Sequence, residues 1–216
     1  MTTHTLHYIF DPLCGWCYGV APLVKAARAI KGISIDLHGG GMMVGNHRST
    51  IDAQWRGHVI EHDARIAAMT GQPFGDAYIN GLLLDTTAVM DSAPPTCAIL
   101  AAQKLAGRGL DMLHLIQVAH YQHGKRVADL PVLEALALEL GLSAPHFSAE
   151  MQAIDGEILN QHIAESRALL AQLGGRGFPT FALENNVGQL QVLDAGHYLG
   201  DVPAWQEMLL RSVARA

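Results

Sequence analysis

The chain has 216 residues, of which 50% are hydrophobic and 16% charged, and its net charge is −6 from 20 acidic and 14 basic side chains. This composition excludes an intrinsically disordered chain and supplies enough apolar material for one sizeable core, alone or with a smaller inserted domain. The basic residues are scattered, so we expect no nucleic-acid partner and no membrane-surface partner.

The N-terminal segment MTTHTLHYIFDPLC has no basic region, no long apolar stretch and no small-residue cleavage site, so it does not resemble a signal peptide. No segment approaches the ~20 consecutive apolar residues that span a bilayer. We therefore predict a cytoplasmic protein. Three cysteines in such a protein are unsuited to a structural disulfide framework.

The first elements alternate between strand and helix. LHYIF, residues 6–10, predicts a short buried strand, which ends at Asp11-Pro12 because proline cannot donate to a sheet ladder. Apolar residues then recur at helical spacing over residues 14–30. ISIDLH, residues 33–38, alternates like a second strand, and the glycines at 39–41 predict a turn after it.

The region from about 50 to 173 is rich in alanine and leucine and contains no convincing strand. Ser92 and Asp129 each precede prolines and are predicted to cap the helices that follow. The last helix is expected to break near Gly156. The expected helices cover residues 51–70, 75–84, 94–107, 110–122, 131–140 and 144–173.

Strand patterns return at the end of the chain. TFALE, residues 180–184, and residues 187–195 flank Asn185-Asn186, a pair suited to the positive φ angles of a tight hairpin turn. A final helix is predicted to begin at Asp201-Val202-Pro203. The order of elements predicts an α/β fold with a mixed sheet and a large all-helical insertion.

The strongest chemical signal is CGWC, residues 14–17. Cys14 lies where strand gives way to helix, and the free N–H groups of a first helical turn favour its thiolate form, which is the nucleophile. Cys17, one turn further on, is placed to attack a mixed disulfide formed at Cys14. The pattern predicts a redox pair that carries its own electrons and needs no cofactor.

CGWCYGVAPL, together with GGRGFPTF at residues 174–181, resembles the active-site segments of thioredoxin-fold proteins. The long helical stretch between them resembles the DsbA family and its cytosolic, FrnE-like and protein-disulfide-isomerase-like relatives. The resemblance implies a thioredoxin-like domain made of residues 1–45 and 174–216. Residues 46–173 would form the helical insertion, with its last helix packed on the sheet.

The same resemblance implies thiol–disulfide exchange, as a reductase or isomerase of protein or low-molecular-weight disulfides, with glutathione as a possible co-substrate. Pro179 would be a cis-proline beside Cys14. Phe178 would present its backbone to an extended substrate, and Trp16 would be a further substrate contact. The resemblance does not predict the oligomeric state.

Two features depart from familiar members of this group. Tyr8 occupies the position, six residues before Cys14, where thioredoxins and periplasmic DsbA proteins carry a buried acid; whether Asp11 replaces that acid is left open. The dipeptide between the cysteines is Gly-Trp and lacks the histidine of strongly oxidising DsbA enzymes. We therefore expect a less oxidising redox couple.

Metal binding is the first alternative. A CxxC can be half of a structural zinc site, but such a site needs four ligands and no second CxxC exists. HVIEH, residues 58–62, matches the H-x-x-E-H pattern of inverted zinc metallopeptidases. His62 shares a helical stripe with Trp55 and Ile66, however, so we expect it in or beside the core of the insertion. We predict no metal site.

Two further alternatives keep the fold but change the chemistry. Kappa-class glutathione transferases and 2-hydroxychromene-2-carboxylate isomerases generally carry a serine at the position of Cys14 and lack the second cysteine. The presence of both Cys14 and Cys17 favours redox exchange over that chemistry. The other alternative is a noncatalytic binding module. Cys97 is expected to be a small buried hydrophobe.

Overall fold

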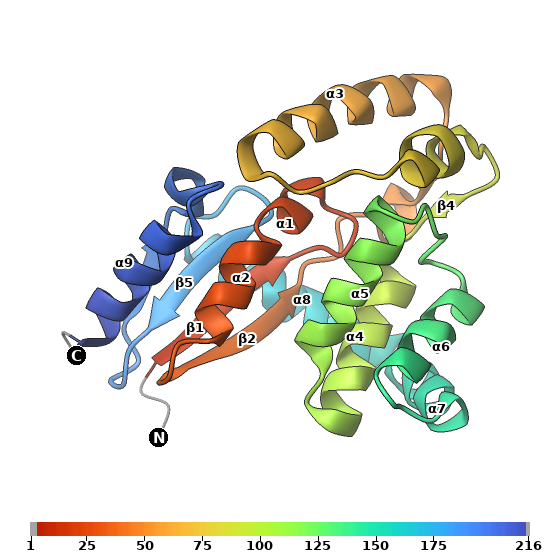
Figure 1. Ribbon diagram of the computed structural model, residues 1–216. Coiled ribbons are helices and arrows are strands. Elements are labelled where there is room, and N and C mark those ends of the chain that lie inside the picture. The colour runs from red at the N-terminus through yellow and green to blue at the C-terminus, as the bar shows by residue number, and fades with distance from the viewer. Residues whose placement is uncertain (1–3, 215–216) are drawn as a thin grey trace.

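The computed structural model describes residues 4–214 and has a four-stranded mixed sheet at its centre (Figure 1). The strands are β1 (His4–Phe10), β2 (Ile33–Gly39), β5 (Thr180–Glu184) and β6 (Leu190–Leu193), in the order β2-β1-β5-β6. β1 runs parallel to β2 and antiparallel to β5, and β5 pairs antiparallel with β6. The predicted mixed sheet is thus confirmed.

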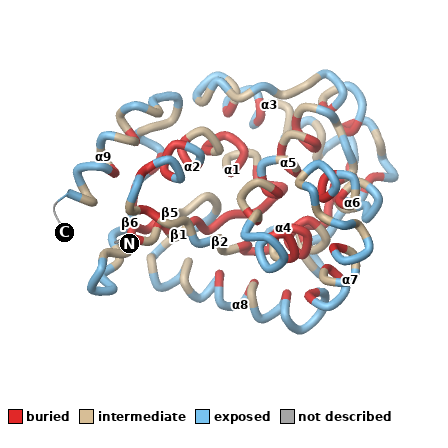
Figure 2. Tube along the Cα trace, turned by 60° about the horizontal axis from the view of Figure 1, so that its bottom comes forward, coloured by how far each residue is buried: buried red, intermediate tan, exposed pale blue. Residues whose placement is uncertain are grey.

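Helices cover both faces of the sheet. α1 (Gly15–Gly19), α2 (Ala21–Arg28) and α9 (Val202–Ala214) lie on one face, and α8 (Glu157–Gln172) lies on the other (Figures 1 and 2). On the α2 side the ring of Tyr8 stacks on Phe181, with centroids 4.7 Å apart. Trp205 of α9 packs on Phe181 and donates to the carbonyl of Leu23 at 3.0 Å.

The helical pattern predicted over residues 14–30 is divided between two helices. α1 ends at Gly19 and α2 begins at Ala21. Pro22 lies in the first turn of α2, where its missing N–H leaves no hydrogen bond unmade. The chain therefore restarts a helix at Pro22, and the short α1 carries only the segment around the cysteine pair.

The segment between β2 and β5 is mainly helical, as predicted. The break at Gly156 separates α7 from α8, and Gly156 adopts a φ of +92°. The helices before α8 are α3 (Ala53–Thr70), α4 (Ala93–Ala106), α5 (Gly109–Tyr121), α6 (Leu130–Glu139) and α7 (Ala144–Ile154). None of the helices within residues 4–214 is both long and apolar enough to cross a bilayer.

Short elements fill the connections. The helix predicted over 75–84 is instead a π-helical turn, η2 (Ala77–Gly81), followed by a 3₁₀ turn, η3 (Leu82–Leu84). Two-residue strands that the sequence did not predict, β3 (Ser49–Thr50) and β4 (Val89–Met90), pair with each other. The remaining 3₁₀ turns are η1 (Gly45–His47) and η4 (Ala195–Tyr198).

Two local predictions are wrong in detail. α4 and α6 begin near Ser92 and Asp129, but neither side chain caps its helix. The β5–β6 connection is not a two-residue turn on Asn185-Asn186, because the residue with positive φ is Gly188. Asn185 organises this longer loop through its side-chain oxygen, which accepts from the amides of Val187 and Gln189.

Candidate active site

The cysteine pair lies at the start of α1, directly after β1. Cys14 is the residue before the first turn of α1, with extended backbone angles, and Tyr18 donates its amide to the Cys14 carbonyl. Both cysteines are free thiols. Cys14 keeps 7% of its surface exposed and Cys17 keeps none. Of the two sulfurs, that of Cys14 is therefore the one a partner can reach.

The loop before β5 meets Cys14 from the other end of the chain. The Phe178–Pro179 peptide bond is cis. The Cys14 thiol donates to the Phe178 carbonyl at an Sγ–O distance of 3.5 Å. The predicted contact between this loop and the cysteine pair is therefore present. The ring of Phe178 packs against Gly40, in the glycine loop at 39–41 that follows β2.

Cys17 holds its proton more firmly than a free thiol does. Burial raises the pKa of Cys17 well above its ordinary value, and its hydrogen bond to Cys14 adds to that shift. The backbone of Asp11 hydrogen-bonds to Cys17 and acts in the opposite direction. Tyr8 donates its hydroxyl to the Cys17 carbonyl at 3.1 Å.

Asp11 is a fully buried acid next to this pair. Its carboxylate accepts from the Leu13 amide at 2.9 Å, the Ser92 hydroxyl at 2.8 Å and the Met42 amide at 2.5 Å. Burial raises the pKa of Asp11, while these three hydrogen bonds oppose the shift. Asp11 also acts electrostatically on Cys17 and raises its pKa. A buried carboxyl, that of Asp11 and not of residue 8, is thus close enough to act on Cys17.

α3 crosses over α1, packs against it and covers the segment that carries the cysteines (Figure 1). A Cβ atom at Gly15 would come within 2.9 Å of Asp63 Oδ1 and of Ile66 Cδ1. Asp63 is buried and accepts from the Tyr78 hydroxyl at 2.8 Å. Its burial raises the pKa of the carboxyl to about 6. The glycine of the CGWC motif therefore permits the close approach of this helix.

His62, expected in or beside the core of the insertion, lies beside it. The residue is exposed, but it contacts Trp16, which packs against the core. Its ring makes an edge contact with half-buried Trp16, with centroids 5.6 Å apart. The buried residues of α3 are Asp63 and Ile66, so its inner face includes a carboxylate that the apolar pattern did not indicate. Trp16 is held between the cysteine pair and α3.

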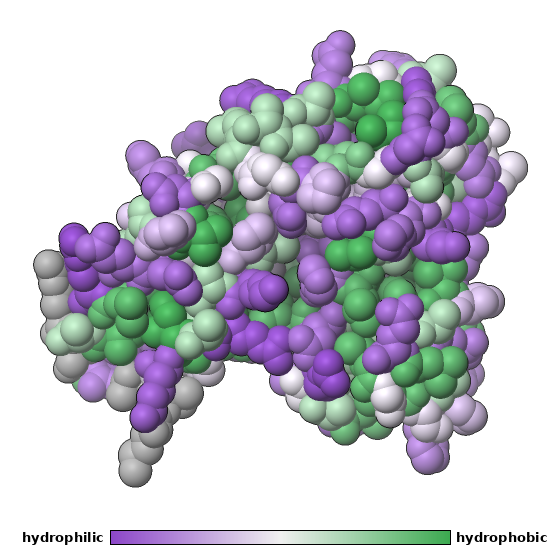
Figure 3. Space-filling view, viewed as in Figure 1, coloured by the Kyte–Doolittle hydropathy of each residue, from purple (hydrophilic) through white to green (hydrophobic). Residues whose placement is uncertain are grey.

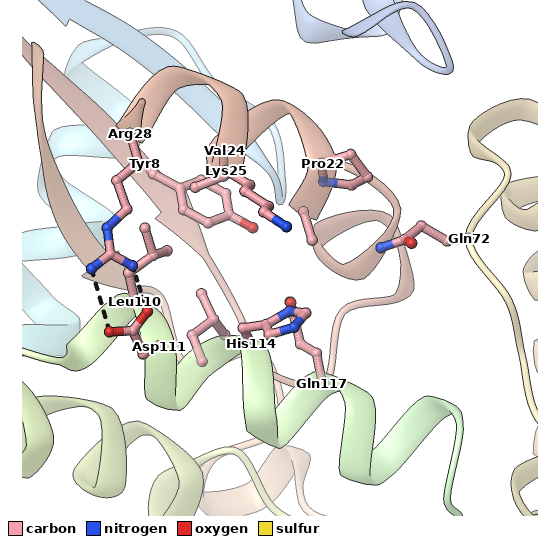
Figure 4. Close-up of a pocket in the computed structure, with 12 residues that line it drawn as sticks. Tyr8, Pro22, Val24, Lys25, Arg28, Gln72, Leu110, Asp111, His114 and Gln117 are labelled. Atoms are coloured by element: carbon pink, nitrogen blue, oxygen red, sulfur yellow. Dashed lines mark hydrogen bonds and ion pairs between the residues drawn. The ribbon is translucent and has the colours of Figure 1, made fainter. Parts of the chain in front are cut away.

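Two hollows flank the active-site helices. One, of about 470 Å³, lies beside Trp16, Pro179 and Thr180 and extends to the turn after β6. The other, of about 360 Å³, lies between α2 and α5 and shares no lining residue with the first (Figure 4). Tyr8, Lys25 and His114 point into this second hollow, and hydrophilic side chains gather over its mouth (Figures 3 and 4).

Cys97 takes no part in this arrangement. It is 3% exposed, and burial, with smaller contributions from Asp155 and Asp91, raises its pKa to about 12. A buried thiol of this kind is chemically inert. Its environment agrees with the expected role as a small core residue.

Taken together, a reachable cysteine at a helix start, a buried cysteine one turn later and a cis-proline loop against the first sulfur define a thiol–disulfide oxidoreductase of the thioredoxin fold. The model of the DSBA-like thioredoxin domain family matches residues 5–197. The chain belongs to this family.

Solved structures agree with this assignment. The cytosolic disulfide reductase DsbM from Pseudomonas aeruginosa is 52% identical, with a TM-score of 0.92 over 98% of this chain and 100% of that one. The same reductase with GSH is 51% identical, with a TM-score of 0.90 over 97% and 99%. A candidate protein disulfide isomerase from Nitrosomonas europaea, 21% identical over 97% and 98%, has the same fold with a TM-score of 0.78. No curated protein matches the chain significantly.

Proposed function

We propose that this protein is a cytoplasmic disulfide reductase that exchanges electrons with glutathione or another low-molecular-weight thiol. The observation that carries the proposal is the pairing of Cys14, whose sulfur lies 3.5 Å from the Phe178 carbonyl, with the fully buried Cys17 behind it. The 52% identity to a cytosolic disulfide reductase, also solved with GSH, supports the reducing direction and the thiol partner.

In the proposed reaction the Cys14 thiolate attacks one sulfur of a substrate disulfide and releases the other as a thiolate. Cys17 then loses its proton and attacks the Cys14 sulfur, which releases the second substrate thiolate. Two electrons pass from the cysteine pair to the substrate, and a Cys14–Cys17 disulfide remains. Two glutathione thiols would restore the dithiol and leave as glutathione disulfide.

The substrate would bind in the 470 Å³ hollow beside Trp16 and Pro179. The backbone of Phe178, the residue before Pro179, would pair with an extended peptide or with the peptide bonds of glutathione. Trp16, which lines the same hollow, would supply an apolar contact. The hollow between α2 and α5 lies apart from these residues and has no role in the proposed reaction.

Asp11 is the proposed acceptor of the Cys17 proton. The raised pKa of Cys17 means that its attack on Cys14 needs a base nearby, and Asp11 is a fully buried carboxylate that interacts with it electrostatically. The hydrogen bonds from Leu13, Ser92 and Met42 fix the orientation of that carboxylate.

We also propose the division of the chain that the sequence indicates. A thioredoxin-like domain would comprise residues 1–45 and 174–216, of which 1–3 and 215–216 lie outside the described residues. The helical insertion would comprise residues 46–173. Its last helix, α8, contacts β2, and His162 of α8 accepts from the Gly39 amide at 3.0 Å.

A single-turnover experiment with prereduced protein and an aromatic disulfide that releases a coloured thiolate tests the roles of the cysteines. The wild type should release two equivalents. The Cys17→Ser variant should release one and retain the other half as a mixed disulfide visible by mass spectrometry. The Cys14→Ser variant should release neither rapidly, because Cys17 is buried.

Cys97→Ser is the matched control and should still release two equivalents. Rapid release from Cys14→Ser, or loss of the second equivalent in Cys97→Ser, would refute these roles. The direction is tested by equilibrating the Cys14–Cys17 couple with glutathione. A potential near the cytosolic glutathione poise of about −220 to −260 mV is expected, whereas one near the value of about −120 mV for DsbA would indicate an oxidant.

A further inference from the structure

A second cluster of chemically active side chains lies on the sheet face opposite α2. It consists of His7 on β1, Asp36 and His38 on β2, and Glu184 on β5. The parallel register places His7 opposite Asp36 and Ile9 opposite His38, so Asp36 and His38 are two residues apart on one face. Tyr8 lines the hollow beside α2, so His7, its neighbour on the strand, faces the α8 side.

Three donor atoms in this cluster converge. His7 Nδ1 lies 3.0 Å from His38 Nε2 and 3.8 Å from Asp36 Oδ2, and His38 Nε2 lies 3.4 Å from Asp36 Oδ2. A tetrahedral zinc ion with ligands at about 2.0–2.1 Å holds its ligand atoms roughly 3.3 Å apart. The three observed separations bracket this value. Within residues 4–214, no other group of three such side chains meets this closely.

Glu184 fixes the tautomer of His7. Its Oε2 lies 2.8 Å from His7 Nε2, so this nitrogen carries the proton and donates it to the carboxylate. The unprotonated Nδ1 atom then accepts from His38 Nε2 at 3.0 Å, and an ion bound between the two rings would displace this proton, which His38 can carry on its Nδ1 atom instead. A carboxylate that holds the distal N–H of a histidine is the usual outer partner of a metal-bound imidazole.

The two histidines of the cluster are largely buried, whereas Asp36 is open to solvent. The side chains of His7 and His38 are 13% and 18% exposed, so their positions are fixed by the sheet, while Asp36 is 58% exposed and leaves an entry path. Ligands carried by adjacent strands are held more rigidly than ligands on loops. A hydrated ion could therefore reach the three donors without movement of the backbone.

From this geometry we infer that His7, Asp36 and His38 form a binding site for a zinc-class divalent cation, with Glu184 as the outer partner of His7. Two imidazole nitrogens and one carboxylate oxygen suit zinc, whereas calcium and magnesium prefer oxygen ligands alone. The fourth coordination position would face solvent and hold water. Because β2 is an edge strand, the ion would fasten that edge to β1.

The test uses the full chain with Cys14 and Cys17 oxidised to their disulfide, so that no thiolate pair can bind the metal. Zinc titrated into this protein should bind at one equivalent and raise the melting temperature by mass action. Cobalt(II) should give the d–d absorption of a nitrogen- and oxygen-ligated ion without thiolate charge-transfer bands. The Asp36→Asn and His38→Gln variants should each fail to bind this equivalent of zinc, and zinc should no longer raise their melting temperatures.

His197→Gln is the matched control, because His197 and Asp194 form an exposed pair at 2.9 Å that lacks a third donor. It should bind zinc like the wild type. Asp36→Asn is nearly isosteric at an exposed position, so its melting temperature without zinc should stay close to that of the wild type. If the oxidised wild type does not bind zinc, the inference is overturned, and the cluster is only a hydrogen bond between the two imidazoles. An equivalent of zinc that persists in both cluster variants would also overturn the inference.

Discussion

Gly40 lies directly beneath the ring of Phe178, and a Cβ atom at residue 40 would come within 2.1 Å of Phe178 Cζ. The glycine loop is itself fixed from α8, because Arg167 donates to the carbonyls of Gly40 and Gly41 at 2.8 and 2.6 Å. The Phe178 carbonyl can therefore reach Cys14 only because residue 40, directly after β2, has no side chain.

A Gly40→Ala substitution should accordingly slow thiol–disulfide exchange by displacing Phe178 and its carbonyl. Misplacement of a reacting group by about 1 Å can cost on the order of 10²-fold in rate, so we expect a loss of tenfold or more. The first equivalent of thiolate released by prereduced protein measures it. Adding Phe178→Ala to the same chain restores the space; if the single variant already reacts at the wild-type rate, the ring does not position the site.

Gly15→Ala should destabilise the protein by bringing a methyl group against α3. The added atom would meet Asp63 and Ile66 at 2.9 Å, and overpacking of this kind typically costs about 1–3 kcal/mol. Urea unfolding monitored by circular dichroism gives the change in the free energy of unfolding. Gly57→Ala, inside α3 where an added methyl group would meet nothing within 4 Å, is the control and should stabilise by about 0.5–1 kcal/mol. Equal effects of the two substitutions would contradict the close approach.

Asp63 should make stability depend on pH. Its pKa in the folded chain is raised to about 6, so the folded state disfavours the ionised carboxyl. The stability associated with the neutral form is fully present below about pH 4 and is lost as the pH rises through 6. The Asp63→Asn variant has no ionisable group at this position, so its free energy of unfolding should not fall in this range. Between pH 4 and pH 7 the wild type should therefore lose roughly 1–3 kcal/mol of stability relative to the variant. Parallel stability curves for the two proteins would argue against a buried, ionising Asp63.

Asp11→Asn should slow the second half of the reaction and spare the first. The amide keeps the shape of the carboxyl but cannot accept the proton that Cys17 must lose. In single-turnover experiments the first equivalent of thiolate should appear at nearly the wild-type rate. The second should be delayed by about 10²-fold or more, consistent with loss of a general base.

Ser92→Ala provides a graded companion to this variant, because it removes only one of three hydrogen bonds to Asp11. The change should favour the protonated carboxyl, since that bond opposes the rise in the pKa of Asp11. The pH at which the second step reaches half its maximal rate should therefore move upward. A second step that is fast in Asp11→Asn would assign the proton to another acceptor.

Much of the fold was accessible from the sequence because its signals are local. Helical spacing, prolines at helix starts and glycines at helix ends indicated α3 to α8 close to their observed bounds. Ser92 illustrates where local reasoning fails. It precedes two prolines as a capping residue would, but its hydroxyl donates to Asp11, which is 81 residues earlier in the sequence. Tertiary contact, which the local pattern does not contain, decided its partner.

The site was predicted in its chemistry and less completely in its surroundings. Through a family resemblance, the CxxC and the distant Phe-Pro segment indicated that Pro179 lies beside Cys14, and the contact observed there is with the carbonyl of the preceding residue, Phe178. The packing of α3 against Gly15, by contrast, involves the buried carboxylate of Asp63, and an apolar stripe does not indicate a buried acid. His7, Asp36 and His38 carry no motif at all, because only the pairing of β1 with β2 brings them together.

The strand order has a consequence for the synthesis of the chain. β1, which leads into Cys14, lies between β2 and β5, and β5 begins only at Thr180. While the ribosome is still making the helices, one edge of β1 has no partner and the Cys14 sulfur has no carbonyl against it. During synthesis the cysteine pair is therefore made well before the loop that meets it, and the redox centre can be completed only after residues 178–184 have left the ribosome.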